Sequence, residues 1–137
     1  MNKLYAFLHP EIPEEKEVII STRFKDEEGN PVPFRIRPIT GEENDALIKK
    51  CTTQKKSKND FRKFDAQKYN RALVVAATVF PDFRDAELCQ AYGVVDPEAL
   101  VTKMLLVGEY QKLSEEVLLL SGLDDDAAED TITEAKN

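Results

Sequence analysis

The residue type best suited to acid–base chemistry near neutral pH is histidine, and this sequence has a single one, His9. His9 precedes Pro10 in a segment without regular apolar spacing, and no spacing singles out partners for a nucleophilic triad. The sequence also lacks a phosphate-binding glycine loop, a His-Glu-x-x-His zinc motif and a Gly-x-Ser-x-Gly turn. We therefore interpret His9 as a loop or packing residue and predict no catalytic residue.

The thiols and clustered acids give no pattern typical of a metal site. Cys51 and Cys89 are far apart and outside any Cys-x-x-Cys spacing, so we expect both to be reduced. The run of acids at residues 124–126 lacks the glycine turn and the later glutamate of a calcium loop. The sequence therefore predicts no metal, no other cofactor and no enzymatic activity.

Two charged stretches stand out in a chain of 137 residues with a net charge of −7. Residues 49–63 carry seven basic side chains against one acid, Asp60. Residues 123–137 carry six acids against one base, Lys136, and show no apolar periodicity. We predict a disordered acidic tail over residues 123–137 and a mobile basic loop over about 52–59.

The basic loop is one candidate partner-binding surface, through Lys55, Lys56 and Lys58. These lysines could contact phosphates while Phe61 and Phe64 stack on bases. Two phenylalanines three residues apart before a helix are, however, more typical of core anchors, and the rest of the protein is acidic. We favour a loop that contacts an acidic protein partner or has no specific role over one that binds nucleic acid.

The last helix supplies the second candidate surface. Spacings of four, three, four and three residues predict a core stripe that consists of Leu106, Tyr110, Leu113, Val117 and Leu120. Other apolar residues fall outside this stripe, namely Leu105, Val107, Leu118 and Leu119. Either neighbouring helices cover these four side chains, which we favour in a small domain, or they form a patch that binds a partner.

The N-terminal third is predicted to contain a β-hairpin over about residues 16–38. Apolar residues alternate with polar ones along residues 16–24 and again along residues 32–36, and a turn sequence over residues 26–31 separates the two runs. An isolated hairpin is only marginally stable in water, so its apolar face should pack on the helices that follow.

The remainder, about residues 41–122, is predicted to be helical. A capping box at Thr40 and Glu43 starts a helix over about residues 41–50, and a central helix that is apolar nearly all round ends near Phe80. A short helix over about residues 85–92 and a long one over about 96–121, bent at Gly108, complete the chain. The predicted fold is α+β: a mostly helical single domain over residues 1–122, with one hairpin packed on four or five helices.

Hydrophobic residues make up 42% of the chain and charged residues 33%, which suits a folded globular domain. No apolar run is long enough to span a bilayer, and the first ten residues lack the apolar stretch of a secretory signal. We expect the protein to remain in the cytosol.

Four segments, taken in order and at this chain length, resemble one family. They are Phe34-Arg35-Ile36-Arg37-Pro38-Ile39-Thr40, Thr78-Val79-Phe80-Pro81-Asp82-Phe83, Glu87-Leu88-Cys89-Gln90-Ala91-Tyr92-Gly93, and Met104-Leu105-Leu106-Val107-Gly108-Glu109-Tyr110 with Leu113 and Gly122 beyond it. From about Phe34 to Leu123 the chain thus resembles the XkdN-like tail assembly chaperones of long-tailed phages and prophages.

The resemblance implies a non-enzymatic protein that acts in the host bacterial cytosol during tail assembly. It would bind the tape measure protein, keep that long chain soluble and help to bring subunits of the major tail tube protein to it. Two other functions stay open. One is a structural protein of the virion tail or neck, and the other is a small nucleic-acid-binding module that uses the basic stretch 49–63.

Overall fold

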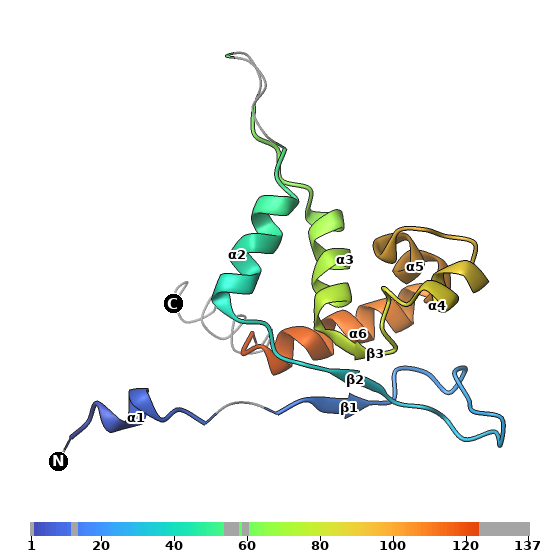
Figure 1. Cartoon of the computed structure of the whole chain (residues 1–137), viewed down its shortest axis with the longest axis horizontal. Coiled ribbons are helices and arrows are strands. Elements are labelled where there is room, and N and C mark those ends of the chain that lie inside the picture. Colours follow the sequence, from blue (N-terminus) through green and yellow to red (C-terminus); the bar gives the residue numbers. More distant parts are fainter. Residues whose placement is uncertain (1, 12–13, 54–57, 59–60, 124–137) are drawn as a thin grey trace, which may run out of the picture.

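A computed structural model of the chain describes residues 2–11, 14–53, 58 and 61–123, and shows a mostly helical α+β architecture (Figure 1). The acidic tail and most of the basic loop predicted above lie outside these residues. In order along the described chain, the elements are α1 (Tyr5–Leu8), β1 (Lys16–Val18), β2 (Phe34–Ile36), α2 (Gly41–Lys50), α3 (Ala66–Ala77), β3 (Thr78–Phe80), α4 (Ala86–Ala91), α5 (Pro97–Met104) and α6 (Val107–Leu120). The predicted α+β class is confirmed.

The three strands form one antiparallel sheet in the order β1-β2-β3. The predicted hairpin is confirmed: Val18 of β1 lies opposite Phe34 of β2, although both strands are shorter than predicted. Its turn also follows the sequence, because the Asp26 carboxylate accepts hydrogen bonds from two backbone amides of the turn, each at 2.9 Å, and Gly29 takes a positive φ of 87°.

Strand β3 is a correction to the sequence analysis, which assigned these residues to the end of the central helix. The hydroxyl of Thr78 donates to the Val74 carbonyl at 2.7 Å, and the Ala77 carbonyl accepts from the Arg37 amide at 2.8 Å instead of continuing the helix. The backbone then pairs with β2, where the β-branched and aromatic side chains of this segment fit a sheet. Long-range pairing therefore overrides the local helical pattern.

Helix starts agree closely with the local signals. At α2, the Thr40 hydroxyl accepts from the Glu43 amide at 3.2 Å, and the Glu43 carboxylate accepts from the Thr40 amide at 3.3 Å, so the predicted capping box is present. Aspartates cap α3, α4 and α5 in the same way. Gly93 and Gly122 take positive φ angles after α4 and α6, as expected of residues that end helices.

The single long helix predicted over 96–121 is wrong, because the chain forms α5 and α6 with two extended residues between them. Leu105 and Leu106 leave helical geometry, and the Glu109 carboxylate accepts a hydrogen bond from the Leu106 amide at 2.8 Å, which starts α6. The break exchanges the roles of the two leucines. Leu106, predicted in the core, is 60% exposed, whereas Leu105 is buried.

The core lies between the sheet and helices α3, α5 and α6. Most of α3 beyond its first turns is buried, which confirms the prediction of a central helix covered on several sides. Within the described chain, the large side chains that are fully buried come from these elements and the loop after β3: Ile36, Val74, Phe83, Leu100, Val101, Leu113 and Val117. This arrangement fixes which apolar residues remain at the surface.

Candidate protein-binding surfaces

One face of α6 carries residues that the core covers only in part or not at all. Val107, Tyr110, Ser114 and Leu118 recur at three- and four-residue spacings and therefore share a face, which we call the α6 face. Val107 is 84% exposed, and the other three side chains are half-buried. The α6 face is thus partly packed along its length and open at its N-terminal end.

A pocket of about 310 Å³ opens beside Val107 at the junction of α5 and α6. It is lined by Leu105 and Tyr110 together with Val101 of α5 and Arg71 of α3. Leu105 belongs to the buried core, so it forms part of the pocket floor. The structure therefore brings together two of the predicted partner-binding residues, Leu105 and Val107, at one apolar pocket with a basic side chain at its wall.

The other two predicted residues lie at the opposite end of α6. Leu118 packs against the core and lines a smaller pocket of about 150 Å³ with residues of α2 and α3. Leu119 is 50% exposed and points about 100° away around the helix, so it lies outside the α6 face. Of the four apolar residues singled out from the sequence, Val107 and Leu119 are the ones that a partner can reach without unpacking the core.

The basic stretch forms the base of an arm between α2 and α3. Thr52 pairs with Phe64, the Thr53 amide donates to the Lys63 carbonyl at 2.8 Å, and the two segments run side by side away from the helices (Figure 1). Lys58 is exposed, whereas Lys55 and Lys56 lie outside the described residues. Their predicted role in partner binding therefore stays a prediction.

The two phenylalanines of this arm are not core anchors, and that interpretation is wrong. Phe61 is 89% exposed. Phe64 is 45% exposed and packs its ring on Tyr69, with 5.6 Å between ring centroids. Because the paired backbone of the arm carries both residues away from the core, their spacing before the helix does not bring them inward.

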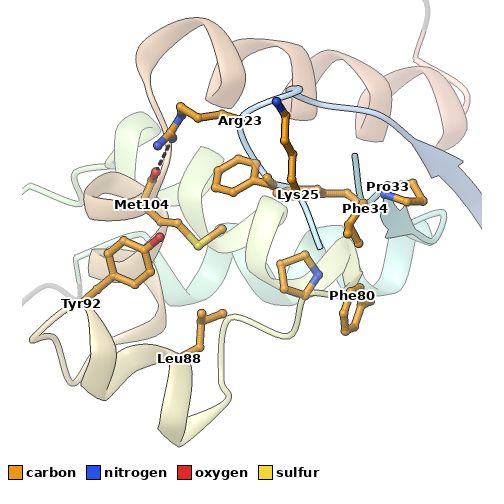
Figure 2. Close-up of a pocket in the computed structure, with 11 residues that line it drawn as sticks. Arg23, Lys25, Pro33, Phe34, Phe80, Leu88, Tyr92 and Met104 are labelled. Carbon is orange, nitrogen blue, oxygen red and sulfur yellow. Dashed lines mark hydrogen bonds between the residues drawn. The ribbon is translucent and has the colours of Figure 1, made fainter. Parts of the chain in front are cut away.

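A third surface, which we call the hairpin groove, was not found from the sequence. Figure 2 shows its apolar floor between the loop that joins β1 to β2, the end of β3, helix α4 and the end of α5. Its volume is about 310 Å³, and its lining includes Phe24, Phe34, Phe80, Leu88, Tyr92 and Met104. These residues come from four separate segments, so no local spacing in the sequence predicts the groove.

The hairpin groove continues into a second hollow of about 400 Å³ that shares Phe80, Pro81 and Leu88 with it. The two ends differ in charge. Lys25 lines the first hollow, whereas the acids Asp82, Asp85 and Glu87 line the second. The combined surface is therefore an apolar channel with a basic end and an acidic end.

An ion pair joins the hairpin to the junction of α5 and α6. The Arg23 guanidinium donates to both carboxylate oxygens of Glu109, at 2.6 and 3.0 Å, and to the Met104 carbonyl at 2.9 Å, the last of which Figure 2 shows. Glu109 is buried, and the hydrogen bonds from Arg23 are the main cause that lowers its pKa to about 2. This pair fixes the wall shared by the hairpin groove and the break between the two helices.

The residues considered for chemistry lie apart from one another. The ring of His9 stacks on that of Tyr5 with 4.1 Å between centroids, in agreement with a packing role. Cys51 and Cys89 are both free and buried, and burial raises the pKa of the Cys51 thiol. Among the described residues, no group of three or more His, Cys, Asp or Glu side chains could hold a metal ion, and no helix is long and apolar enough to cross a membrane.

Comparisons with known proteins identify the family and agree with the fold. Residues 4–136 match the family described as phage XkdN-like tail assembly chaperone protein. The chain is 39% identical over 127 residues to the phage-like element PBSX protein XkdN of Bacillus subtilis, covering 90% of this chain and 85% of that protein. The protein YqbN of the same organism is 41% identical over 127 residues, with the same coverage.

The crystal structure of YqbN has a similar fold. It superposes with a TM-score of 0.75 at 34% identity, and the match covers 90% of this chain and 98% of that one. The chain belongs to the family of XkdN-like phage tail assembly chaperones, which confirms the resemblance found in its sequence.

Proposed function

We propose that this chaperone binds the tape measure protein in the host bacterial cytosol and helps to recruit subunits of the major tail tube protein. The observation that carries the proposal is the exposure of Val107, at 84%, beside the apolar pocket at the junction of α5 and α6. Exposure of an apolar side chain to water is unfavourable. Burial of Val107 and the adjacent pocket by a partner would therefore stabilise the complex.

The shape of this surface suits a helical partner. Val107 and the pocket lie at one end of the α6 face, and half-buried Leu118 lies at the other, about three turns along the helix. A partner helix laid along α6 would meet apolar side chains at intervals, as in helix-in-groove recognition. Leu119, exposed beside this face, would extend the contact. A long helical chain, as we propose for the tape measure protein, would fit this surface.

Coexpression tests the proposal. The chain is produced in bacteria with the tape measure protein encoded with it, and the soluble fraction is scored for that partner and for its copurification. We expect the tape measure protein to be soluble and bound when the chaperone is present, and insoluble without it. A tape measure protein that stays insoluble and unbound would contradict the proposed function.

Finished tails distinguish the chaperone from a structural protein of the tail or neck. A chaperone that acts only during assembly should be absent from purified tails, whereas a structural protein should be present in fixed stoichiometry. Mass spectrometry of purified particles measures this difference. Detection of the chain in stoichiometric amounts would favour the structural function.

The arm supports nucleic-acid binding as a second candidate function, because Phe61 is 89% exposed beside the exposed basic side chains Arg62 and Lys63. An exposed aromatic ring next to basic side chains can stack on a base while the cations contact phosphates. Binding of a labelled single-stranded oligonucleotide, measured at increasing salt, tests it. Binding that weakens steeply with salt and is lost in Phe61→Ser would favour this candidate, and no binding would remove it.

A further inference from the structure

Helix α1 is an apolar segment that the protein's own core leaves uncovered. Leu4, Tyr5, Phe7 and Leu8 are between 58% and 80% exposed, and no residue of α1 is buried. In Figure 1, α1 lies beyond the start of β1, clear of helices α3 to α6. A single helical turn is not stable by itself in water, because too few hydrogen bonds offset the cost of nucleation. The four side chains therefore need a cover.

The hairpin groove has the complementary properties. Its floor is apolar, Phe80 within it is 51% exposed, and its two hollows of about 310 and 400 Å³ are each large enough to bury side chains of a docked segment. Among the described residues, the chain thus presents a short exposed apolar segment and an exposed apolar groove.

The charges at the two ends also match. Lys3 precedes the apolar run of α1 and Glu11 follows it. In the groove, Glu87 lies at the acidic end and Lys25 at the basic end. Opposite charges therefore meet at both ends when Lys3 faces Glu87 and Glu11 faces Lys25, which fixes one direction of docking.

We propose that α1 of one copy docks in the hairpin groove of a second copy of this chain. In Figure 1, α1 lies beyond the left end of the sheet, whereas α4 and the loop that joins β1 to β2 lie toward the right, so the chain would have to reverse along β1 to reach its own groove. Exchange between two copies needs no such reversal and produces two equivalent contacts related by a two-fold axis.

The area available is sufficient for a specific dimer. Aromatic side chains bury about 150–250 Å² each on docking, so two arms with two aromatic and two leucine side chains apiece bury on the order of 1,000 Å². This value is at the low end for a specific interface, so the dimer should exchange with monomer at micromolar concentrations. The hairpin groove is separate from the α6 face, and this inference does not depend on the proposed function.

Cross-linking between differently labelled copies tests the proposal directly. One chain carries Lys3→Cys and the other carries Glu87→Cys, the two positions that face each other in the proposed direction, while the native thiols are buried. Under mild oxidation, the mixture should form a disulfide-linked dimer in higher yield than either variant alone. A chain that carries both substitutions and closes its bond within one monomer at all concentrations would overturn the proposal, because it would show that α1 covers its own groove.

Light scattering during gel filtration measures the same association in the unlabelled protein. Phe7→Ser should raise the dissociation constant of the dimer at least about tenfold, because it removes an aromatic side chain that docking would bury. Val95→Ser is the matched control, because Val95 is 97% exposed and lies outside both α1 and the groove. It should leave the dimer unchanged. A wild-type chain that is monomeric at all concentrations, or association unaffected by Phe7→Ser, would contradict the proposal.

A charge exchange tests the direction of docking. Lys3→Glu and Glu87→Lys should each weaken the dimer roughly two- to fivefold, and the two together should restore it. Both side chains are exposed, so neither change threatens the fold. Two weakening effects that simply add in the double variant would rule out the proposed direction.

Discussion

Helices α3 and α6 are both rich in apolar residues, but they use them differently. In α3, Leu73, Val74 and Val75 are all buried, since α2, α5, α6 and β3 contact this helix. In α6, Leu113 and Val117 are fully buried, whereas Val107 and Leu119 remain exposed. Helices of similar composition therefore differ in exposure: α3 buries its apolar residues, whereas α6 leaves some of them at the surface.

The exposed side chains of α6 follow from the way this helix begins. Because the chain leaves helical geometry at Leu105 and Leu106, the start of α6 is displaced from the end of α5 and carries Val107 outward. The Arg23–Glu109 pair holds this break in place. Three features of α6 account for its difference from α3: its buried stripe, the ion pair that sets its start, and its exposed residues.

The largest effect is expected in the buried stripe. Leu113→Ala should lower the free energy of unfolding by about 3 kcal/mol, because Leu113 is fully buried and its truncation leaves a cavity. Urea denaturation measures the change. Val107→Ala on the same helix should change stability by less than about 0.5 kcal/mol. Equal losses in the two variants would show that the contrast between buried and exposed residues is wrong.

The ion pair should have the next largest effect. Glu109→Gln removes the carboxylate that accepts from Arg23 and from the Leu106 amide, and should cost about 2 kcal/mol. Urea denaturation at pH 7 checks this value. A variant as stable as the wild type would mean that the pair does not hold the start of α6.

The same pair predicts an acid-sensitive component of stability. The folded pKa of Glu109 is about 2, below the ordinary value of 4.5, so its contribution is fully present above about pH 4.5 and is lost as the pH falls toward 2. Glu109→Gln should flatten the stability curve over this range. Glu43→Gln is the control: the Arg37 guanidinium also lowers the Glu43 pKa, but both side chains of that pair are 36% exposed, so solvent screening should leave a smaller shift than at buried Glu109. If the pH dependence of stability flattened equally in both variants, the burial of Glu109 would not be what makes its contribution larger.

A smaller effect is expected at the start of α2, which is set by local contacts only. Thr40→Ala removes the hydroxyl that accepts from the Glu43 amide and should cost about 1 kcal/mol. Thermal unfolding followed by circular dichroism measures it. Thr40→Ser, which keeps the hydroxyl, should remain close to wild type, and an equal loss in both would argue against the cap.

Features set by neighbouring residues could be predicted from the sequence, and features set by distant ones could not. The bounds of α2 follow from Thr40 and Glu43, three residues apart. By contrast, the break before α6 depends on Arg23, which is 86 residues from Glu109, and β3 depends on pairing with β2. The hairpin groove needs the same long-range assembly. Apolar surplus on the last helix was visible in the sequence, but which of its residues stay exposed was not.

The measurement that tests the central claim most directly is the affinity of the purified chain for the tape measure protein when the exposed residues of α6 are changed. Val107→Ser with Leu119→Ser should change stability little, because Val107 is 84% and Leu119 50% exposed. Val95→Ser provides a matched exposed valine away from α6. We predict that the double variant binds at least about tenfold more weakly while Val95→Ser binds like the wild type. Wild-type affinity in the double variant would contradict the account that α6 carries the partner-binding surface.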